Sequence, residues 1–215
     1  MELNKCYLGD CLDIMRDMPD KCVDLVLTDP PYGIGDKLSI GGCTKPNRMQ
    51  ELYNNSDWID EVPSKEYFDE IFRISKNQVI SGGNYFYLPP TRGFIVWDKI
   101  KSATNYSQAE YIWTSFDRVS KIFRFCSNGG FVLNKNNLKM HPTQKPLELI
   151  EWILKEYSSE DQIIFDPFAG SHTTAVACIN TGRKFICVEK DEEFYKIGVE
   201  RVRKAQAQGK LAEWF

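Results

Sequence analysis

Short apolar runs alternate with amphipathic stretches along the chain. The apolar runs are rich in β-branched and aromatic residues and end at turn residues, which is typical of buried strands. The amphipathic stretches carry apolar residues three and four positions apart, which is typical of helices packed on a core. The pattern predicts strands at 5–8, 23–28, 78–81, 93–98, 111–114, 121–125, 163–166 and 184–189, and helices at 11–18, 64–75, 146–157, 173–180 and 192–207.

The alternation also predicts the architecture. Strands that alternate with helices form parallel, doubly wound sheets with helices on both faces, so we expect a single α/β domain over residues 1–215. Residues 33–57 depart from the pattern, because they show little periodicity and are too many for a routine connection. We expect a functional loop there.

Composition narrows the class of protein. Seven cysteines are scattered without a Cys-x-x-Cys pair, the chain has only two histidines, and it shows neither a signal-peptide pattern nor an apolar run of membrane length. We therefore expect a cytoplasmic protein with reduced thiols, no metal site and no membrane contact. The net charge is −3, so nucleic-acid binding has to come from a local basic patch.

The strand at 23–28 ends in the segment Asp29-Pro30-Pro31-Tyr32. Ligands of open α/β sheets bind at the carboxyl ends of the strands, and two prolines make the backbone rigid there. The segment presents a carboxylate, a proline carbonyl and an aromatic ring to one small volume. That set suits an amino group on a planar heterocycle such as a nucleobase. The alternative is a plain strand-ending turn in which Asp29 caps its own backbone.

A second turn of this kind follows the strand at 163–166. Its sequence is Asp166-Pro167-Phe168-Ala169-Gly170-Ser171-His172-Thr173-Thr174, and its small residues let the backbone approach a ligand at a helix N-terminus. Glu189 ends the next strand, roughly 20 residues further on, where an acid can bind two ribose hydroxyls. The combination predicts a nucleoside cofactor. The alternative is an ordinary βαβ unit with a solvated Glu189.

Together with His141-Pro142-Thr143-Gln144-Lys145-Pro146, these segments resemble the amino-group (N6-adenine and N4-cytosine) DNA methyltransferases of the permuted class β. The resemblance extends from Gly9 to the last helix. It implies a Rossmann-like, mostly parallel sheet of seven strands and S-adenosylmethionine as methyl donor. It also implies that a catalytic half, about residues 1–117, precedes a cofactor half, about residues 141–207.

The resemblance assigns roles to individual residues. The catalytic motif comprises Asp29, Pro30, Pro31 and Tyr32. The cofactor residues are Asp10 and Cys11 beside the adenine, Thr143, Gln144 and Lys145 closing over the cofactor, Asp166, Phe168, Gly170, His172 and Thr173 in the glycine turn, and Glu189 at the ribose.

His172 departs from the family pattern, which usually has glycine at this position. A side chain there either blocks the approach of the cofactor or contacts it. Histidine tolerates a positive φ comparatively well, so we hypothesise that the turn and cofactor binding are retained.

The same resemblance implies a mechanism and a substrate. Asp29 and the Pro30 carbonyl would accept the two N–H groups of an exocyclic amine and localise its lone pair for in-line attack on the methyl group. The target adenine must be flipped out of duplex DNA and could stack on Tyr32. Aspartate at the first motif position favours adenine N6 by resemblance alone.

Basic residues without acidic neighbours gather after residue 117. We predict DNA contacts from the loops 33–57 and 118–140; the residues are Lys45, Arg48, Arg118, Lys121, Arg124, Lys135 and Lys139. A solvated hairpin is the alternative. Neither loop is large, so we expect a specificity that is short or relaxed or that needs a second subunit. We expect a monomer or homodimer, and both a partner restriction enzyme and a phage origin stay open.

The sequence also bears on three other functions. Cytosine N4 or an RNA base as substrate stays open, and His172 keeps a catalytically silent DNA-binding relative open. A nicotinamide dehydrogenase is disfavoured, because the glycine turn lies late and lacks Gly-x-Gly-x-x-Gly.

Overall fold

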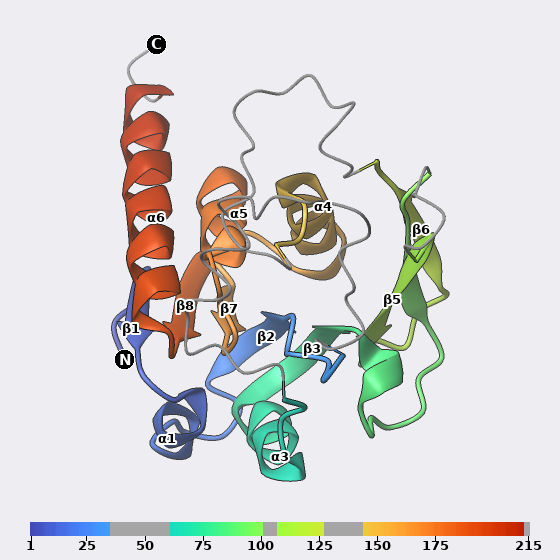
Figure 1. Cartoon of the computed structure of the whole chain (residues 1–215). Coiled ribbons are helices and arrows are strands. Elements are labelled where there is room, and N and C mark those ends of the chain that lie inside the picture. Colours follow the sequence, from blue (N-terminus) through green and yellow to red (C-terminus); the bar gives the residue numbers. More distant parts are fainter. Residues whose placement is uncertain (35–60, 101–106, 127–143, 213–215) are drawn as a thin grey trace, which may run out of the picture.

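A mixed β-sheet forms the centre of the computed structural model, which describes residues 1–34, 61–100, 107–126 and 144–212 (Figure 1). Within these residues the sheet has eight strands in the order β1-β8-β7-β2-β3-β5-β4-β6. The strands are β1 Lys5–Leu8, β2 Val23–Thr28, β3 Ser75–Ser81, β4 Phe94–Asp98, β5 Ala109–Thr114, β6 Lys121–Arg124, β7 Ile163–Asp166 and β8 Lys184–Glu189. The doubly wound α/β architecture predicted from the sequence is confirmed, with one strand more than the seven that the resemblance implied.

Strand directions place the carboxyl ends of most strands along one edge of the sheet. Strand β5 runs antiparallel to β3 and β4, and the other neighbouring pairs are parallel. Strand β2 lies between β7 and β3, so strands from both halves of the chain belong to one sheet. The carboxyl ends of β2 and β7 therefore lie side by side, which is the geometry that a crevice for ligands requires.

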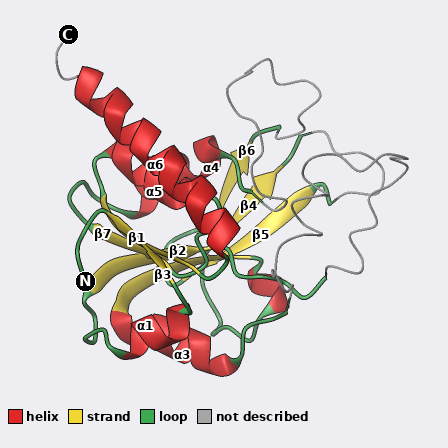
Figure 2. Cartoon of the chain, turned by 60° about the vertical axis from the view of Figure 1, so that its left-hand side comes forward, coloured by secondary structure: helices red, strands yellow, loops and turns green. Residues whose placement is uncertain are grey.

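Helices cover both faces of the sheet, as Figure 2 shows. The helices α1 (Cys11–Arg16) and α3 (Lys65–Ile74) lie on one face. The helices α4 (Leu147–Tyr157), α5 (Thr173–Thr181) and α6 (Glu192–Ala212) lie on the other. A short 3-10 helix, η2 (Gly83–Tyr85), follows β3. None of the helices in the described part of the chain is both long and apolar enough to cross a membrane.

Two element boundaries differ from the sequence prediction in an informative way. Strand β3 begins at Ser75, three residues before the predicted start, because α3 ends at Ile74 and Ser75 is already extended with φ −117° and ψ 149°. The β3 residues that precede the apolar run pair with β2 in parallel register, so sheet pairing extends the strand. Helix α6 continues to Ala212, five residues beyond the predicted end.

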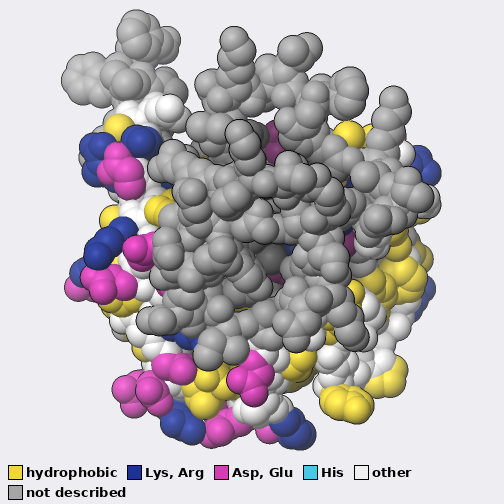
Figure 3. Space-filling model, in the orientation of Figure 1, with side chains coloured by type: hydrophobic (Ala, Val, Ile, Leu, Met, Phe, Trp, Pro, Cys, Tyr) yellow, Lys and Arg dark blue, Asp and Glu magenta, His cyan; other side chains and the backbone are white. Residues whose placement is uncertain are grey.

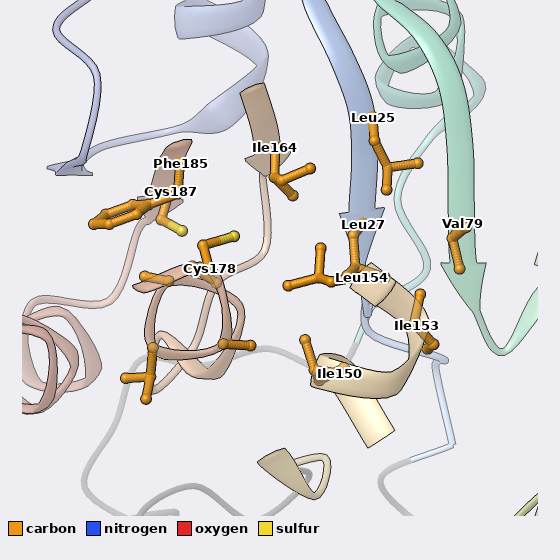
Figure 4. Packing of buried hydrophobic residues seen from close by; sticks show 14 of the residues in the cluster. Leu25, Leu27, Val79, Ile150, Ile153, Leu154, Ile164, Cys178, Phe185 and Cys187 are labelled. Carbon is orange, nitrogen blue, oxygen red and sulfur yellow. The ribbon is translucent and has the colours of Figure 1, made fainter. Parts of the chain in front are cut away.

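The core forms two apolar layers because successive side chains of a strand point to opposite faces. Leu25 and Leu27 of β2 pack in the layer under α4 and α5, whereas Val26 packs in the layer above α1 and α3. Figure 4 shows the first layer, with Leu27 beside Leu154 of α4. Strand β2 is thus covered on both faces, which explains the apolar run at 23–28 that the sequence shows.

The described surface carries mixed charges. Figure 3 shows basic and acidic side chains beside one another along α6, and ion pairs within that helix join Lys196 to Glu192 and Arg203 to Glu200. Opposite charges four and three residues apart neutralise one another locally. This face of α6 therefore presents no field of a single sign.

Candidate active site

Asp29 directly follows β2, where Pro30 and Pro31 end the strand. Its carboxylate is held from two sides: Oδ1 accepts a hydrogen bond from the Tyr32 hydroxyl at 2.5 Å, and Oδ2 forms an ion pair with the Lys145 ammonium at 2.6 Å. Lys145 precedes α4 and lies 116 positions further along the chain. The carboxylate is thus fixed by a rigid local turn and by one distant cation.

Asp166 stands at the equivalent end of the neighbouring strand β7. Thr28 donates a hydrogen bond to its Oδ1 at 2.8 Å and Thr174 donates one to its Oδ2 at 2.6 Å. Burial raises the pKa of Asp166 to about 6, although these hydroxyls act in the opposite direction. Because Thr28 is the last residue of β2, this hydrogen bond joins the ends of the two central strands.

The glycine turn between β7 and α5 has the conformation that close approach of a ligand needs. Gly170 has φ +50°, and its N–H donates to Oε2 of Glu189 at 2.6 Å. Glu189 also accepts a hydrogen bond from the N–H of Asp191 through Oε1, at 2.9 Å. The acid at the end of β8 therefore holds the turn, and each of its oxygens still has a free lone pair for a ligand hydroxyl.

One cavity of about 370 Å³ connects these groups. Both Asp29 and Gly170 line it, so the proline turn and the glycine turn face the same space. The sequence-predicted site residues in its wall are Asp10, Cys11, Asp29, Pro31, Gln144, Lys145, Asp166, Phe168, Gly170, Thr173 and Glu189. Of the remaining predicted residues, Pro30, Tyr32 and His172 are not in the wall, and Thr143 lies outside the described residues.

His172 does not face the cavity. Its φ is +59°, so the turn keeps the left-handed conformation in spite of the missing glycine. The side chain is fully buried, its ring centroid lies 5.9 Å from that of Tyr195, and it fills the space beside Gly198 of α6. The expectation of a contact with the cofactor therefore needs correction: the imidazole points into the protein and neither blocks the cavity nor lines it.

Tyr32 is part of an aromatic stack. Its ring lies parallel to that of Tyr85, with centroids 4.7 Å apart and an interplanar angle of 13°. A Cβ at position 82 would lie 2.2 Å from Cε1 of Tyr32, so only glycine fits there. Gly82 also has a φ of +68°, a left-handed conformation that favours glycine. The stack places η2 against the segment Asp29-Pro30-Pro31-Tyr32.

Several residues of the site carry no local sequence signal. Tyr67 of α3 donates to Asp10, at 3.1 Å to Oδ2, and its ring lies 5.9 Å from that of Phe168. Glu110 of β5 and Lys99 form an ion pair at 2.6 Å, and Glu110 lies 3.4 Å from Lys145. A glutamate inside a strand is an unusual feature of the sequence, but the sequence does not predict its partners, because they come from other segments of the folded sheet.

Arg201 of α6 connects that helix to the glycine turn. Its guanidinium donates to the carbonyl and hydroxyl of Ser171 and to the Thr173 hydroxyl at 3.1 Å. The Ser171 hydroxyl in turn donates to Oε1 of Gln144 at 3.1 Å. Burial lowers the pKa of Arg201 to about 10. A chain of hydrogen bonds therefore runs from α6 through the turn to the segment that precedes α4.

The basic residues predicted to contact DNA lie partly within the described chain. Arg118 donates to the Glu156 carbonyl at 2.7 Å and Lys121 pairs with the Glu156 carboxylate, at the start of β6. Since β6 runs parallel to β4, this start lies at the edge of the sheet opposite the cavity, which does not favour a role for these two residues. Arg124 ends β6, the outermost strand, on the same edge of the sheet as the cavity but outside the cavity wall, and pairs with Asp98 at 3.2 Å. Lys45, Arg48, Lys135 and Lys139 lie outside the described residues.

Comparison with known families agrees with this geometry. A family model described as DNA methylase, covering N6 and N4 enzymes, matches residues 70–200, which is more than half of the chain. The chain belongs to the DNA methylase family. This methylase is 27% identical to the type II methyltransferase M2.MboI of Moraxella bovis over 243 residues, which cover 91% of this chain and 86% of that protein.

Solved structures show the same fold. The cytosine-N4-specific PvuII DNA methyltransferase superposes with a TM-score of 0.61 and 16% identity, covering 96% of this chain and 91% of its own. M1.HpyAVI, solved as a complex with SAM, superposes with a TM-score of 0.56 and 21% identity, covering 92% and 98%. The methylase therefore shares its architecture with a cytosine-N4-specific DNA methyltransferase and with a protein solved in complex with SAM.

Proposed function

We propose that this methylase transfers the methyl group of S-adenosylmethionine to the exocyclic N6 amine of adenine in DNA. The observation that carries the proposal is the single cavity in which Asp29 and the turn from Asp166 to Gly170 meet. Methyl transfer needs a site for the amine and a site for the donor in one cavity, so that the amine nitrogen can contact the methyl carbon. The parallel pairing of β2 and β7 supports both sites on one rigid edge.

The residues of the cavity fit the donor. S-adenosylmethionine carries an ammonium group, a sulfonium group and a ribose with two hydroxyls. Buried Asp166 suits a cation, Glu189 has free lone pairs for hydroxyls, and the positive φ of Gly170 brings its backbone close to a ligand. A cavity of about 370 Å³ is within the range of small-molecule sites.

The acceptor side is made by the proline turn. When bound, S-adenosylmethionine supplies an electrophilic methyl group. Asp29 accepts an N–H group of the amine from the cavity wall, and the Pro30 carbonyl, which lies outside that wall in the free protein, is the proposed second acceptor. Both localise the lone pair of the amine, so the chain contributes position and electrostatics rather than a covalent intermediate. Tyr85 stacks on Tyr32 and Gly82 abuts the ring, so a target base stacks on Tyr32 only after Tyr85 moves.

The proposal is tested by transfer of tritiated methyl groups from S-adenosylmethionine to defined duplex DNA, followed by nucleoside analysis. We expect label in N6-methyladenine. Absence of label from DNA of any sequence, with S-adenosylmethionine bound to the protein in calorimetry, would support the silent DNA-binding relative instead. Matched RNA substrates in the same assay address the RNA alternative.

Cytosine N4 is the second candidate, and the likeness to the PvuII enzyme favours it. Both reactions use an exocyclic amine on a planar ring, so the same Asp29 and Pro30 acceptors serve either base. The nucleoside analysis separates the two candidates directly, because N4-methylcytosine and N6-methyladenine differ in mass and retention.

Partners follow from the proposed reaction. DNA is the macromolecular partner, and among the described basic residues Arg124 supports phosphate contact, because it ends β6 on the same edge of the sheet as the cavity. The name of M2.MboI, a type II methyltransferase, supports a function in restriction and modification with a partner restriction enzyme. We further propose a cytoplasmic monomer or homodimer, which size-exclusion chromatography with light scattering would test.

A further inference from the structure

Four buried or half-buried charged side chains form a chain along the edge of the sheet at which the cavity lies. Lys145, whose side chain is 7% exposed, lies 2.6 Å from Oδ2 of Asp29 and 3.4 Å from Oε2 of Glu110. The other oxygen of Glu110 lies 2.6 Å from the Lys99 ammonium. The signs alternate along the chain, and the four charges sum to zero.

The four residues come from four separate segments. Asp29 follows β2, Lys145 precedes α4, Glu110 belongs to β5, and Lys99 follows β4. Each segment contributes one charged side chain, and each charge lies next to an opposite charge from another segment. A buried charge without its partner is costly, so this convergence fixes the position of Lys145 relative to Asp29.

Lys145 does not act as a free cation for a ligand. Its ammonium also donates to the Tyr32 hydroxyl at 3.2 Å, so Asp29 and Tyr32 both accept hydrogen bonds from it, and the Glu110 carboxylate lies 3.4 Å away. Oε2 of Glu110 has no hydrogen bond within the described chain, which means that Lys145 attracts it through charge at 3.4 Å. The resemblance placed Lys145 among the cofactor residues, whereas its contacts connect it to the catalytic carboxylate.

The two oxygens of Asp29 are therefore unequal. Oδ2 is bound by a buried cation, whereas among the residues that the structure describes Oδ1 accepts a hydrogen bond only from a neutral hydroxyl, which leaves it a second lone pair. An incoming amine finds its acceptor at Oδ1 without displacing Lys145.

We propose that Lys145 is a positioning residue for methyl transfer: it holds Oδ2 of Asp29 so that Oδ1 points to the target amine, and Glu110 and Lys99 hold Lys145 in place. This inference rests on the proposed function. It adds that Lys145 orients the Asp29 carboxylate and keeps it ionised.

The charge on Asp29 depends on this arrangement. Burial raises the pKa of Asp29, and the Lys145 ammonium is the main opposing influence. Burial alone would lower the pKa of Lys145, but Asp29 and the other groups around it hold that pKa well above its usual value. The charged or titratable groups that face this pair are Tyr32 on the same turn, Glu110 of β5, Lys99 after β4 and Asp166 of β7.

The test compares Lys145→Met and Lys145→Arg with the wild type. In Lys145→Met the pKa of Asp29 is expected to rise further, so the acid limb of the kcat/KM profile should move up by about 1–2 pH units. We expect kcat to fall about 10-fold to 100-fold and the calorimetric Kd for S-adenosylmethionine to stay within about twofold. Lys145→Arg keeps the positive charge and should recover most of the pH profile.

A second measurement does not need catalysis. The carboxyl carbon of Asp29, assigned by its loss in Asp29→Asn, is titrated by NMR in the wild type, in Lys145→Met and in Glu110→Gln. The midpoint should move upward in Lys145→Met and shift less in Glu110→Gln. This readout stays informative if the wild type transfers no methyl group to DNA, a result that would overturn the proposed function alone.

Lys76→Met is the matched control, since Lys76 pairs with Asp24 at 2.7 Å at the far end of β2 and β3. It should leave the pH profile and the midpoint of Asp29 unchanged. Weaker S-adenosylmethionine binding by Lys145→Met, with an unshifted midpoint and pH profile, would overturn the inference and return Lys145 to the cofactor site.

Discussion

The imidazole of His172 occupies the space that a side chain on Gly198 would need. A Cβ at position 198 would lie 1.4 Å from Nδ1 of His172, so the histidine in the turn requires a glycine at this position of α6. Gly198 costs helix stability, about 1 kcal/mol relative to alanine. The pairing explains how the methylase tolerates a histidine at the turn position where the family pattern has glycine.

The first prediction concerns this pair. His172→Gly removes a buried ring and leaves a cavity, while it relieves the left-handed conformation, so the free energy of unfolding should fall by about 1–3 kcal/mol. The Kd for S-adenosylmethionine should change less than about threefold, because the ring does not line the cavity. Urea unfolding and calorimetry measure the two quantities.

The partner substitution completes a double-mutant cycle. Gly198→Ala alone should destabilise the protein by about 1–3 kcal/mol through overpacking. In the double variant His172→Gly/Gly198→Ala the added methyl has room, and we expect a favourable coupling of at least about 1 kcal/mol. Strictly additive effects would contradict the pairing.

The second prediction is a pH dependence of cofactor binding. Burial raises the pKa of Asp166 to about 6, so its carboxyl group is neutral below that pH and ionised above it. A cationic ligand favours the ionised form, and affinity for S-adenosylmethionine should therefore fall about tenfold from pH ~7 to pH ~5. Calorimetry across this range measures the effect, and Asp166→Asn should bind more weakly with a flatter profile.

The pH dependence of folding stability has the opposite sign to that of cofactor binding. Asp166 ionises in the unfolded chain near its ordinary pKa but in the folded protein only near 6. The free protein should therefore lose stability as pH rises through this interval, by about 3 kcal/mol at most. Asp166→Asn should remove that slope in urea unfolding followed against pH.

The third prediction concerns the catalytic carboxylate. Asp29→Ala should lower kcat at least about 100-fold, because the amine loses the acceptor that localises its lone pair. Cofactor affinity should stay intact, since Asp29 belongs to the acceptor side of the cavity. Asp13→Ala, on the exposed face of α1, is the control. Unchanged turnover in Asp29→Ala would remove the proposed role.

The fourth prediction concerns the acid at the end of β8. Glu189 accepts two backbone N–H groups, one through each oxygen, and an amide has only one oxygen to offer. Glu189→Gln should therefore disturb the glycine turn and weaken S-adenosylmethionine binding about 10-fold to 100-fold. Glu192→Gln, whose glutamate pairs with Lys196 on the surface of α6, should bind normally.

The strands and their terminal acids were predictable because the signals are local. The apolar run before Asp29 and the run before Asp166 each fix a strand and its end. What the sequence could not predict are relations between distant segments. Lys145 meets Asp29 across 116 positions, and Glu110 joins them only through the order of the sheet.

The basic stretch after residue 117 shows the same limit. Its composition predicts phosphate contacts, but the direction of β6 sends Arg118 and Lys121 to the edge away from the cavity. Likewise, Gly198 within a helical pattern signals close packing, yet only the fold shows that the neighbour is His172.

The hydrogen bond from Thr28 to Asp166 has a consequence for how specificity can change. It fastens the strand that carries the acceptor to the strand that carries the donor site, so the spacing of the two reactants is set as the sheet folds and not by a hinge. If the loops predicted to contact DNA are exchanged, the two strand ends should keep their alignment. Such a scaffold can acquire a new target sequence without rebuilding its reaction centre.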